Sequence, residues 1–471
     1  MKKLKTTLLF IFGLISLPSL LFSQTINLNE FLNQLQQTHP FFEKEKLTAQ
    51  IEKEEQDSYL GAQDWNIISS TNFAHEEPAF AFMEPERTNS FSLTCGIERL
   101  FWRTGGRLSS SFSTNYANIN PNYGYPDPFY QNQISITYIH PLLKNRNGFL
   151  DRLQYDLKQY DIDFSRVQAL ENLENFLTQS SEKFLGWVLQ TELKKIVSDR
   201  LELSEEELAR TRKKREANLV DQVDVIRAED AVLISKQNLM LITSQWEAVQ
   251  AELAVISQNN ELYNLSPEYN LYELKEIIPL DKAISHLKEN SRLIRIIDIR
   301  LKQLEFSRKG YAEDIKPDLS LVTAINIKNL NEKFGSSLIM DKPDAMVGLQ
   351  YSFPLEKRTA RSKIIKTNLK IRQLKEQLDD LTLNLVSALT NLHIQIKNLD
   401  KVLKLNQEQI ESAKERTEEE LKLYNQGRGD LTFVIMSRDN EQNAKLTYAQ
   451  NSLMYHKLML QYKALMDQIY E

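Results

Sequence analysis

The stretch that decides the fold is Asp221–Gln258, which reads DQVDVIRAEDAVLISKQNLMLITSQWEAVQAELAVISQ. Its apolar residues recur at alternating steps of three and four positions, and only one member of the series, Ser235, is polar. The series is Val225, Ala228, Val232, Ser235, Leu239, Ile242, Trp246, Val249, Leu253 and Ile256. A heptad pattern of this length predicts a long helix that packs along another helix.

The sequence around this stretch is poor in helix-breaking residues. Between residues 149 and 266 there is one glycine, Gly186, and no proline, and residues 355–471 contain only Gly427 and Gly429. Compact domains need turns roughly every 10 to 20 residues, and turns recruit Gly and Pro. These stretches therefore exclude a sandwich, a parallel α/β sheet and most enzyme folds. They predict very long helices, each roughly 100 Å for about 66 to 69 residues.

The N-terminal residues 1–23 have the pattern of a secretory signal peptide. Three lysines within the first five residues precede the mostly apolar run Leu8–Phe22. An uncleaved anchor is the alternative, but Pro18 interrupts the run, which is short for a spanning helix. Removing three lysines and no acid takes the formal net charge from −6 to −9, which disfavours nucleic-acid binding.

Strand patterns lie in two other regions. The range Trp65–Tyr138 holds 14 aromatic residues in 74, twice the chain average of 9%. Apolar and polar residues alternate in Asn132–His140, Asp318–Lys328 and Met346–Phe353. This pattern fits a membrane β-barrel or a half-buried soluble sheet, and the signal peptide and the aromatic content favour the barrel. The residues expected to face lipid are Ile136, Leu321, Ile325 and Leu349.

The chain reads as two copies of one unit. Residues 28–32 align with residues 280–284 at an offset of 252, and the heptad pattern recurs at an offset of 209, from Asp221 to Asp430. We therefore predict a first repeat over 24–266, with an extra hairpin at about 88–118, and a second over 267–471 with two strands. Each repeat would be a helix, strands, a long helix, a turn and a returning helix, so the fold is mainly α with a β-barrel part.

Equivalent turns are predicted at residues 218–220 and 427–429. Gly427 and Gly429 supply backbone freedom in the second turn. In the first turn Asn218 tolerates a left-handed backbone. Asp221 and Asp430 are suitable N-caps for the helices that follow.

Several motifs occur in the same order in both halves. Tyr424-Asn425-Gln426-Gly427 precedes Phe433-Val434-Ile435, and the first half has Glu216–Val220 followed by Asp224-Val225-Ile226. The strands end in Pro141-Leu142 and Pro354-Leu355, and Thr38-His39-Pro40 lies in the first helix. With these motifs the chain resembles the TolC-like outer-membrane efflux protein family from Leu28 to about Asp467.

This resemblance implies a homotrimer in the outer membrane of a Gram-negative bacterium. Three chains would pool their strands into one barrel in outer-membrane lipid and extend their helices as a tunnel across the periplasm. The implied function is a passive export duct of a tripartite efflux or type I secretion system. Its partners would be a periplasmic adaptor (membrane fusion) protein and an inner-membrane pump of the RND or ABC type. The adaptor would meet the tip residues Asn218, Leu219, Val220, Gly427, Arg428 and Gly429.

A gate is expected where the helices converge at the periplasmic end. Asp224 and Phe433 are repeat equivalents, and Phe433 stands where the family usually has Asp. We expect Asp224 to form a salt-bridge lock with the basic run Arg210–Arg215, and Phe433 with Met436 to form a hydrophobic seal. The alternative is that Phe433 packs between helices.

No catalytic or metal-binding constellation is evident in the sequence. The six histidines are scattered without ligand spacing, and the acidic runs Glu205–Glu207 and Glu418–Glu420 are interpreted as solvated helix faces. We therefore predict neither enzymatic activity nor a cofactor, and no nucleic-acid partner. The competing function is an exported coiled-coil structural or adhesion protein of the cell envelope, although a stalk needs no second set of strands.

Overall fold

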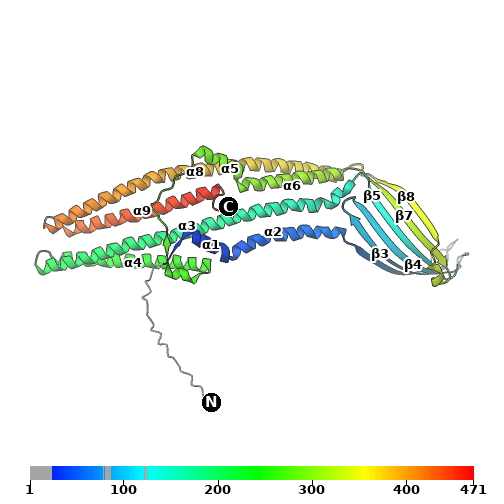
Figure 1. Ribbon diagram of the computed structural model, residues 1–471, viewed down its shortest axis with the longest axis horizontal. Coiled ribbons are helices and arrows are strands. Elements are labelled where there is room, and N and C mark those ends of the chain that lie inside the picture. The colour runs from blue at the N-terminus through cyan, green and yellow to red at the C-terminus, as the bar shows by residue number, and fades with distance from the viewer. Residues whose placement is uncertain (1–23, 78, 80–85, 121–123, 125, 471) are drawn as a thin grey trace, which may run out of the picture. The chain divides into compact units, whose positions relative to one another are not determined.

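The computed structural model describes residues 24–77, 79, 86–120, 124 and 126–470, so the predicted signal peptide lies outside the described residues. The described chain is mostly helical and has one large antiparallel sheet, as predicted (Figure 1). It divides into two compact units. The hairpin unit comprises the residues up to His39, Leu177–Glu276 and Ile394–Gln461. The sheet unit comprises Pro40–Phe176, Ile277–His393 and the residues from Tyr462 on.

The sheet unit is built on six strands in the order β2-β3-β4-β5-β7-β8, each antiparallel to its neighbour. The strands are β2 (Asn66–Glu76), β3 (Arg87–Phe101), β4 (Gly106–Asn120), β5 (Phe129–Pro141), β7 (Asp318–Asn331) and β8 (Lys342–Ser352). The helices α2 (Pro40–Ser58), α5 (Leu280–Asn290), α6 (Arg292–Asp314) and α7 (Phe334–Ser337) belong to the same unit. Among the described helices, none combines the length and the apolar character needed to cross a bilayer.

The register places apolar and polar residues on opposite faces of the sheet. Ile136 lies opposite Ile325, and Leu321 lies opposite Leu349. Directly paired residues share a face, and so do residues four apart on one strand. These four residues therefore share one face, which we call the apolar face. The neighbouring positions Ser135 and Gln350 pair with Asn326 and Ser320 on the opposite, polar face.

The β3–β4 hairpin is an integral part of this sheet, because β3 pairs with β2 and β4 pairs with β5. Its turn is also packed tightly. Trp102 is buried, with its ring 5.4 Å from that of Tyr155. Gly105 has φ +73°, and a Cβ atom there would lie 2.7 Å from the carbonyl oxygen of Asn145. A side chain at this position would be strained and would also clash, so glycine is required.

The hairpin unit contains the predicted long helices. They form two helical hairpins, α3 (Phe149–Glu216) with α4 (Gln222–Ser257), and α8 (Arg358–Asn425) with α9 (Leu431–Leu465); α3 and α8 also contribute to the sheet unit (Figure 1). All ten residues of the predicted apolar series on α4 are buried or half-buried. Its one polar member, Ser235, lies 3.0 Å from the hydroxyl of Ser204 on α3. The heptad pattern therefore identified the packed face of α4.

Short elements complete the two units. The helix α1 (Leu28–Thr38) begins with a capping box in which Asn27 and Glu30 each accept the other's backbone N–H. It ends before Pro40, since a residue preceding proline is disfavoured in a helix. In the hairpin unit β1 (Gln24–Asn27) pairs in parallel with β6 (Leu265–Glu268). Phe31 and Leu35 on α1 are fully buried, and so are their equivalents at an offset of 252, Ala283 and Leu287 on α5.

Candidate functional site

The two turns of the hairpin unit have the same backbone conformation. Asn218 has φ +52° and Gly427 has φ +69°, and these residues are separated by the repeat offset of 209. In each turn the N–H of this residue donates to the carbonyl oxygen three residues earlier. The N–H of the next residue donates to the carbonyl oxygen five residues earlier. The donor–acceptor pairs are Asn218–Arg215 (2.9 Å), Leu219–Lys214 (2.8 Å), Gly427–Tyr424 (3.2 Å) and Arg428–Leu423 (3.0 Å). Both helices thus end in a left-handed residue that satisfies their last carbonyl groups.

Both turns line one hollow of about 1090 Å³. Its lining includes every residue that we predicted for the tip and two of the three predicted for the gate. These are Asn218, Leu219, Val220, Gly427, Arg428, Gly429, Asp224 and Phe433. The side chain of Leu219 is 73% exposed.

A small core joins the two hairpins next to this hollow. Ala228 of α4 packs with Tyr424, Leu431 and Val434 of the other hairpin. The ammonium of Lys214 lies 3.6 Å from the centre of the Tyr424 ring, a cation–π contact. Burial raises the pKa of the Tyr424 hydroxyl, and burial together with Arg210 lowers the pKa of Lys214. The two turns are therefore packed against each other within one chain.

Asp224 forms an ion pair, but with a partner other than the expected one. Arg227 Nη1 lies 3.1 Å from Asp224 Oδ1 and 3.7 Å from Asp430 Oδ1, so one guanidinium connects the two hairpins. The run Arg210–Arg215 does not supply the partner within the chain. Its residue Arg212 pairs instead with Glu229 at 2.8 Å. Within the chain, the cation that pairs with Asp224 is therefore Arg227, one helical turn away on the same helix.

Phe433 and Met436 are not packed between helices within the chain. Their side chains are 52% and 51% exposed. Met436 lines a second hollow of about 440 Å³, together with Arg200, Arg227 and Asp439. In one chain, therefore, these two apolar side chains remain available for contact with another molecule.

The helix caps that follow the two turns differ. Asp430 Oδ1 accepts the backbone N–H of Thr432 at 2.7 Å, and the hydrogen bonds from Thr432 lower the pKa of the Asp430 carboxyl. Asp221 precedes α4 in extended conformation, but its side chain makes no capping hydrogen bond. Asp221 therefore occupies the predicted N-cap position, but its carboxylate does not make the capping hydrogen bond that we expected.

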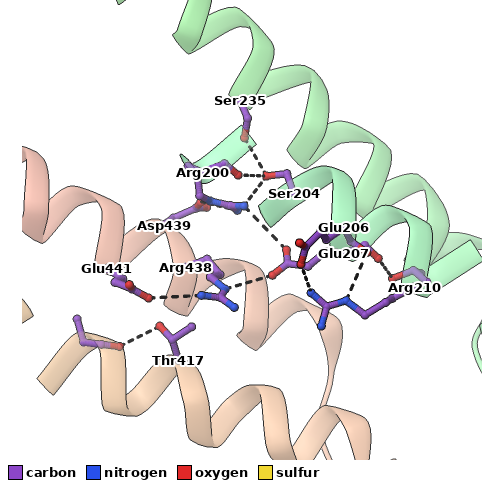
Figure 2. A network of polar contacts seen from close by, with 12 residues as sticks. Arg200, Ser204, Glu206, Glu207, Arg210, Ser235, Thr417, Arg438, Asp439 and Glu441 are labelled. Carbon is purple, nitrogen blue, oxygen red and sulfur yellow. Dashed lines mark hydrogen bonds and ion pairs between the residues drawn. The ribbon is translucent and has the colours of Figure 1, made fainter. Parts of the chain in front are cut away.

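A buried polar network lies along the same helices (Figure 2). Arg200 of α3 pairs with Asp439 of α9 at 3.0 Å and also contacts Ser204 and Glu207. Arg438 of α9 donates to Glu207 at 3.3 Å. Arg200 and Glu207 are 4% and 5% exposed. Because buried charges are stable only when paired, these contacts hold α3 and α9 in one register.

This network was not predicted from the sequence. We interpreted Glu205–Glu207 as a solvated helix face, which is right for Glu205 and Glu206 but wrong for Glu207. The only signal was the polar member of the apolar series, Ser235, which marks the level of the network on α4. Among the described residues, no group of three or more His, Cys, Asp or Glu side chains could hold a metal ion.

The four residues predicted to face lipid lie on the apolar face of the sheet unit. Ile136, Ile325 and Leu349 are 45%, 53% and 68% exposed, and Leu321 is half-buried. The sheet therefore presents a band of large apolar side chains that the chain itself leaves uncovered. That the surrounding medium is lipid remains a prediction.

The fold can be compared with solved structures. The outer-membrane channel OprN matches with a TM-score of 0.71 at 13% identity, over 94% of this chain and 90% of its own. VceC, an outer membrane protein of Vibrio cholerae, matches with 0.68 at 9% identity, over 94% and 97%. The CmeC outer membrane channel of Campylobacter jejuni matches with 0.67 at 12% identity, over 94% and 86%. No protein-family model and no curated protein sequence matches the chain. The TolC-like fold predicted from the motifs is thus confirmed.

Proposed function

We propose that this chain is the outer-membrane component of an export system, a passive duct made of three identical chains in the outer membrane of a Gram-negative bacterium. One observation carries the proposal. A six-stranded sheet with an apolar and a polar face has two edge strands, β2 and β8, that find no further partner in the described chain. This sheet occurs in a fold shared with outer-membrane channels.

The open edges support assembly with other copies of the chain. Nearly every residue of β2 and β8 is exposed, in contrast to the inner strands. Because the sheet has six antiparallel strands, an even number, β8 runs opposite to β2. β8 of one chain can therefore pair with β2 of the next in the same antiparallel manner. Unpaired strand edges are not tolerated in lipid, so a membrane-inserted sheet must close.

The two faces suit the two sides of such a barrel. The apolar face would meet outer-membrane lipid, and the face with Ser135, Gln350 and their polar neighbours would line the channel. Three chains with six strands each reach the size at which barrels enclose an aqueous pore. The helices would continue this lumen through the periplasm.

The hollow between the two turns is the proposed contact site for a periplasmic adaptor protein. Its lining residues Leu219, which is exposed, and Arg428 offer an apolar and a basic surface. An inner-membrane pump, of the RND or the ABC type, would supply energy and choose the cargo. The gate would combine the Asp224–Arg227 ion pair with the exposed Phe433 and Met436.

Matched substitutions on neighbouring residues test the membrane assignment. Arginine at Ile136 or Leu349 should cost roughly 2 to 4 kcal/mol near the bilayer midplane. Arginine at the adjacent Ser135 or Gln350 should be tolerated, since these side chains would face water. The readout is the amount of heat-modifiable trimer in outer-membrane fractions. Equal assembly of both sets would contradict the proposed faces.

The alternative, an exported coiled-coil structural or adhesion protein, makes a different prediction. Such a protein would not conduct ions. If the duct proposal is right, the purified Phe433→Ala chain, which lacks the proposed hydrophobic seal, should form trimers that conduct in planar lipid bilayers. A soluble periplasmic monomer, or a trimer of this variant without conductance, would favour the alternative.

A further inference from the structure

The short helix α7, in the connection between β7 and β8, lies on the apolar face of the sheet. Asn132 Nδ2 donates to Ser337 Oγ at 2.6 Å, and Asn329 Nδ2 donates to the carbonyl oxygen of Ile339 at 2.6 Å. Asn132 and Asn329 are register partners, two residues from Ile134 and Ile327 respectively, so they share the face of these isoleucines. The connection therefore folds back over the face that carries the apolar band.

These contacts explain how two amides can occupy an apolar face. An amide without hydrogen-bond partners is unfavourable in apolar surroundings. Asn132 is completely buried, and Ser337 of α7 accepts the hydrogen bond of its Nδ2 group, although its Oδ1 has no partner in the described part of the chain; α7 and the residues after it accept the hydrogen bonds of Asn329 Nδ2. The segment thus covers the part of the apolar face that carries Asn132 and Asn329. Its own outer surface is exposed there in place of these two amides.

That outward surface is apolar. The side chains of Phe334, Leu338 and Ile339 are 45%, 42% and 70% exposed. They follow each other within six residues, whereas most connections between strands are polar. Exposed apolar residues that cluster in this way mark a contact surface.

α7 also continues a row of aromatic residues across the sheet. Phe73, Phe91, Tyr116 and Tyr130 are consecutive register partners on β2, β3, β4 and β5. The next position, on β7, is Asn331 and not an aromatic residue. Phe334 of α7 fills the gap, with its ring 5.7 Å from that of Tyr130.

Aromatic rows of this kind flank the apolar band of membrane barrels at both water boundaries. Tyr130 and Tyr138 lie on one face of β5, eight residues apart, which at about 3.4 Å per residue is about 27 Å along the strand. This span fits an apolar band about 25 Å tall. The row with Tyr130 lies at the end of β5 away from α3.

We propose that the segment 334–340 binds lipid as part of the outer aromatic girdle. Phe334 replaces the aromatic residue that β7 lacks, and Leu338 and Ile339 enter the boundary region of the outer leaflet. The occupant is lipid rather than a protein because the segment is continuous with the apolar face and with the aromatic row on it. This inference rests on the proposed membrane insertion of the sheet.

The test places a polarity-sensitive bimane label at single cysteines in the full-length chain, after replacement of its only cysteine by Cys95→Ser. Leu338→Cys and Ile339→Cys probe the segment, Ile136→Cys probes the middle of the apolar face, and Ser135→Cys probes the polar face. Labelled trimers are reconstituted in phosphatidylcholine vesicles that contain doxyl lipids with the quencher at shallow or deep positions.

The labels at 338 and 339 should be quenched most by the shallow quencher, the label at 136 most by the deep quencher, and the label at 135 by neither. Quenching at 136 without quenching at 338 and 339 would overturn the inference and leave the proposed function intact. No quenching at 136 would instead contradict membrane insertion, and the inference with it. Two separate positions in the segment guard against a local folding defect in either variant.

Discussion

The α3–α4 turn and the α8–α9 turn have the same backbone but different chemistry. At the shared offset of 209, Asn218 corresponds to Gly427, and the hydrogen bonds that these two residues and the residue after each donate follow the same pattern. The residues after the turn diverge. The ion pair Asp224–Arg227 in the first repeat corresponds to the apolar pair Phe433 and Met436 in the second.

This difference teaches how a duplicated hairpin can keep a shape and acquire two functions. Shape depends on main-chain hydrogen bonds and on one left-handed residue, which either Asn or Gly can supply. The side chains of the next helical turn are free to change because they project outward. In the proposed trimer, the charged pairs of the first repeat and the apolar pairs of the second repeat would therefore alternate around the gate.

The largest effect is expected from breaking the shared backbone. Gly427→Pro forces φ to about −65° where the turn needs a positive value, and it removes the N–H that Tyr424 accepts. We expect a local cost above about 1 kcal/mol and loss of export, with trimer formation retained. Leu219→Asp at the exposed tip should have the same phenotype without changing the backbone.

Cellular drug tolerance or secretion is the readout for these variants, with trimer content as the reference. Asn218→Gly is the control, because glycine accepts the same left-handed conformation. Export in that variant should equal wild type. Normal export by Gly427→Pro would show that the second turn needs no fixed shape.

The next largest effect concerns the apolar pair. If three Phe433 rings form a seal that excludes water, Phe433→Ala should raise the conductance of the purified trimer markedly in planar bilayers. Met436→Ala should raise it less, since methionine is the more adaptable gap filler. Wild-type conductance combined with a less stable trimer would assign Phe433 to an interface between chains.

A smaller effect is expected from the charged pair. Arg227→Met leaves Asp224 without its cation and gives the first repeat the residue that the second has. Exposed ion pairs contribute only about 0.2 to 1 kcal/mol, so the trimer should remain assembled. Repulsion among three Asp224 carboxylates should nevertheless raise conductance at low salt, and screening should remove the difference at high salt.

Arg212→Met is the matched control, because it breaks another exposed pair, with Glu229, on the preceding helix. It should leave conductance unchanged at every salt concentration. The same change in both variants would mean that any lost surface charge alters the pore, and the lock at Asp224 would be rejected.

Periodic signals were sufficient to predict the long elements. The alternation of apolar residues on α4 identified its packed face, and the offset of 209 located both turns, because these features repeat over many residues. The shared face of Ile136, Ile325 and Leu349 followed from strand alternation alone. Each of these predictions rests on many residues of one helix or strand, so a single exception such as Ser235 did not change it.

Features that depend on one neighbour could not be predicted. Glu207 looks like its neighbours in the sequence, and only the meeting of α3 with Arg438 of α9 makes it a buried partner. The four residues of α7 are too few for a period, and their place is set by Asn132, about 200 residues earlier. The sequence alone could not show that Asp224 pairs with Arg227 on its own helix and not with the basic run Arg210–Arg215.

The smallest predicted effect compares the two helix caps. Asp430→Ala removes the acceptor for the Thr432 N–H and should lower the stability of the first turn of α9 by about 1 kcal/mol. This loss corresponds to hydrogen exchange that is roughly fivefold faster in that turn. Asp221→Ala is the matched control and should leave exchange in α4 unchanged, because Asp221 makes no capping hydrogen bond.

The pH dependence gives the same comparison an independent readout. The folded state lowers the pKa of Asp430, so the cap contributes stability above the unfolded pKa of about 3.9 and loses it as the pH falls through the lower folded pKa. Acidification into that range should therefore speed exchange at the start of α9 in wild type but not in Asp430→Ala. If acid speeds exchange at the start of α9 equally in wild type and in Asp430→Ala, the sensitive carboxyl lies elsewhere. If acid also speeds exchange at the start of α4, and Asp221→Ala abolishes that effect, both helices are capped by their aspartates.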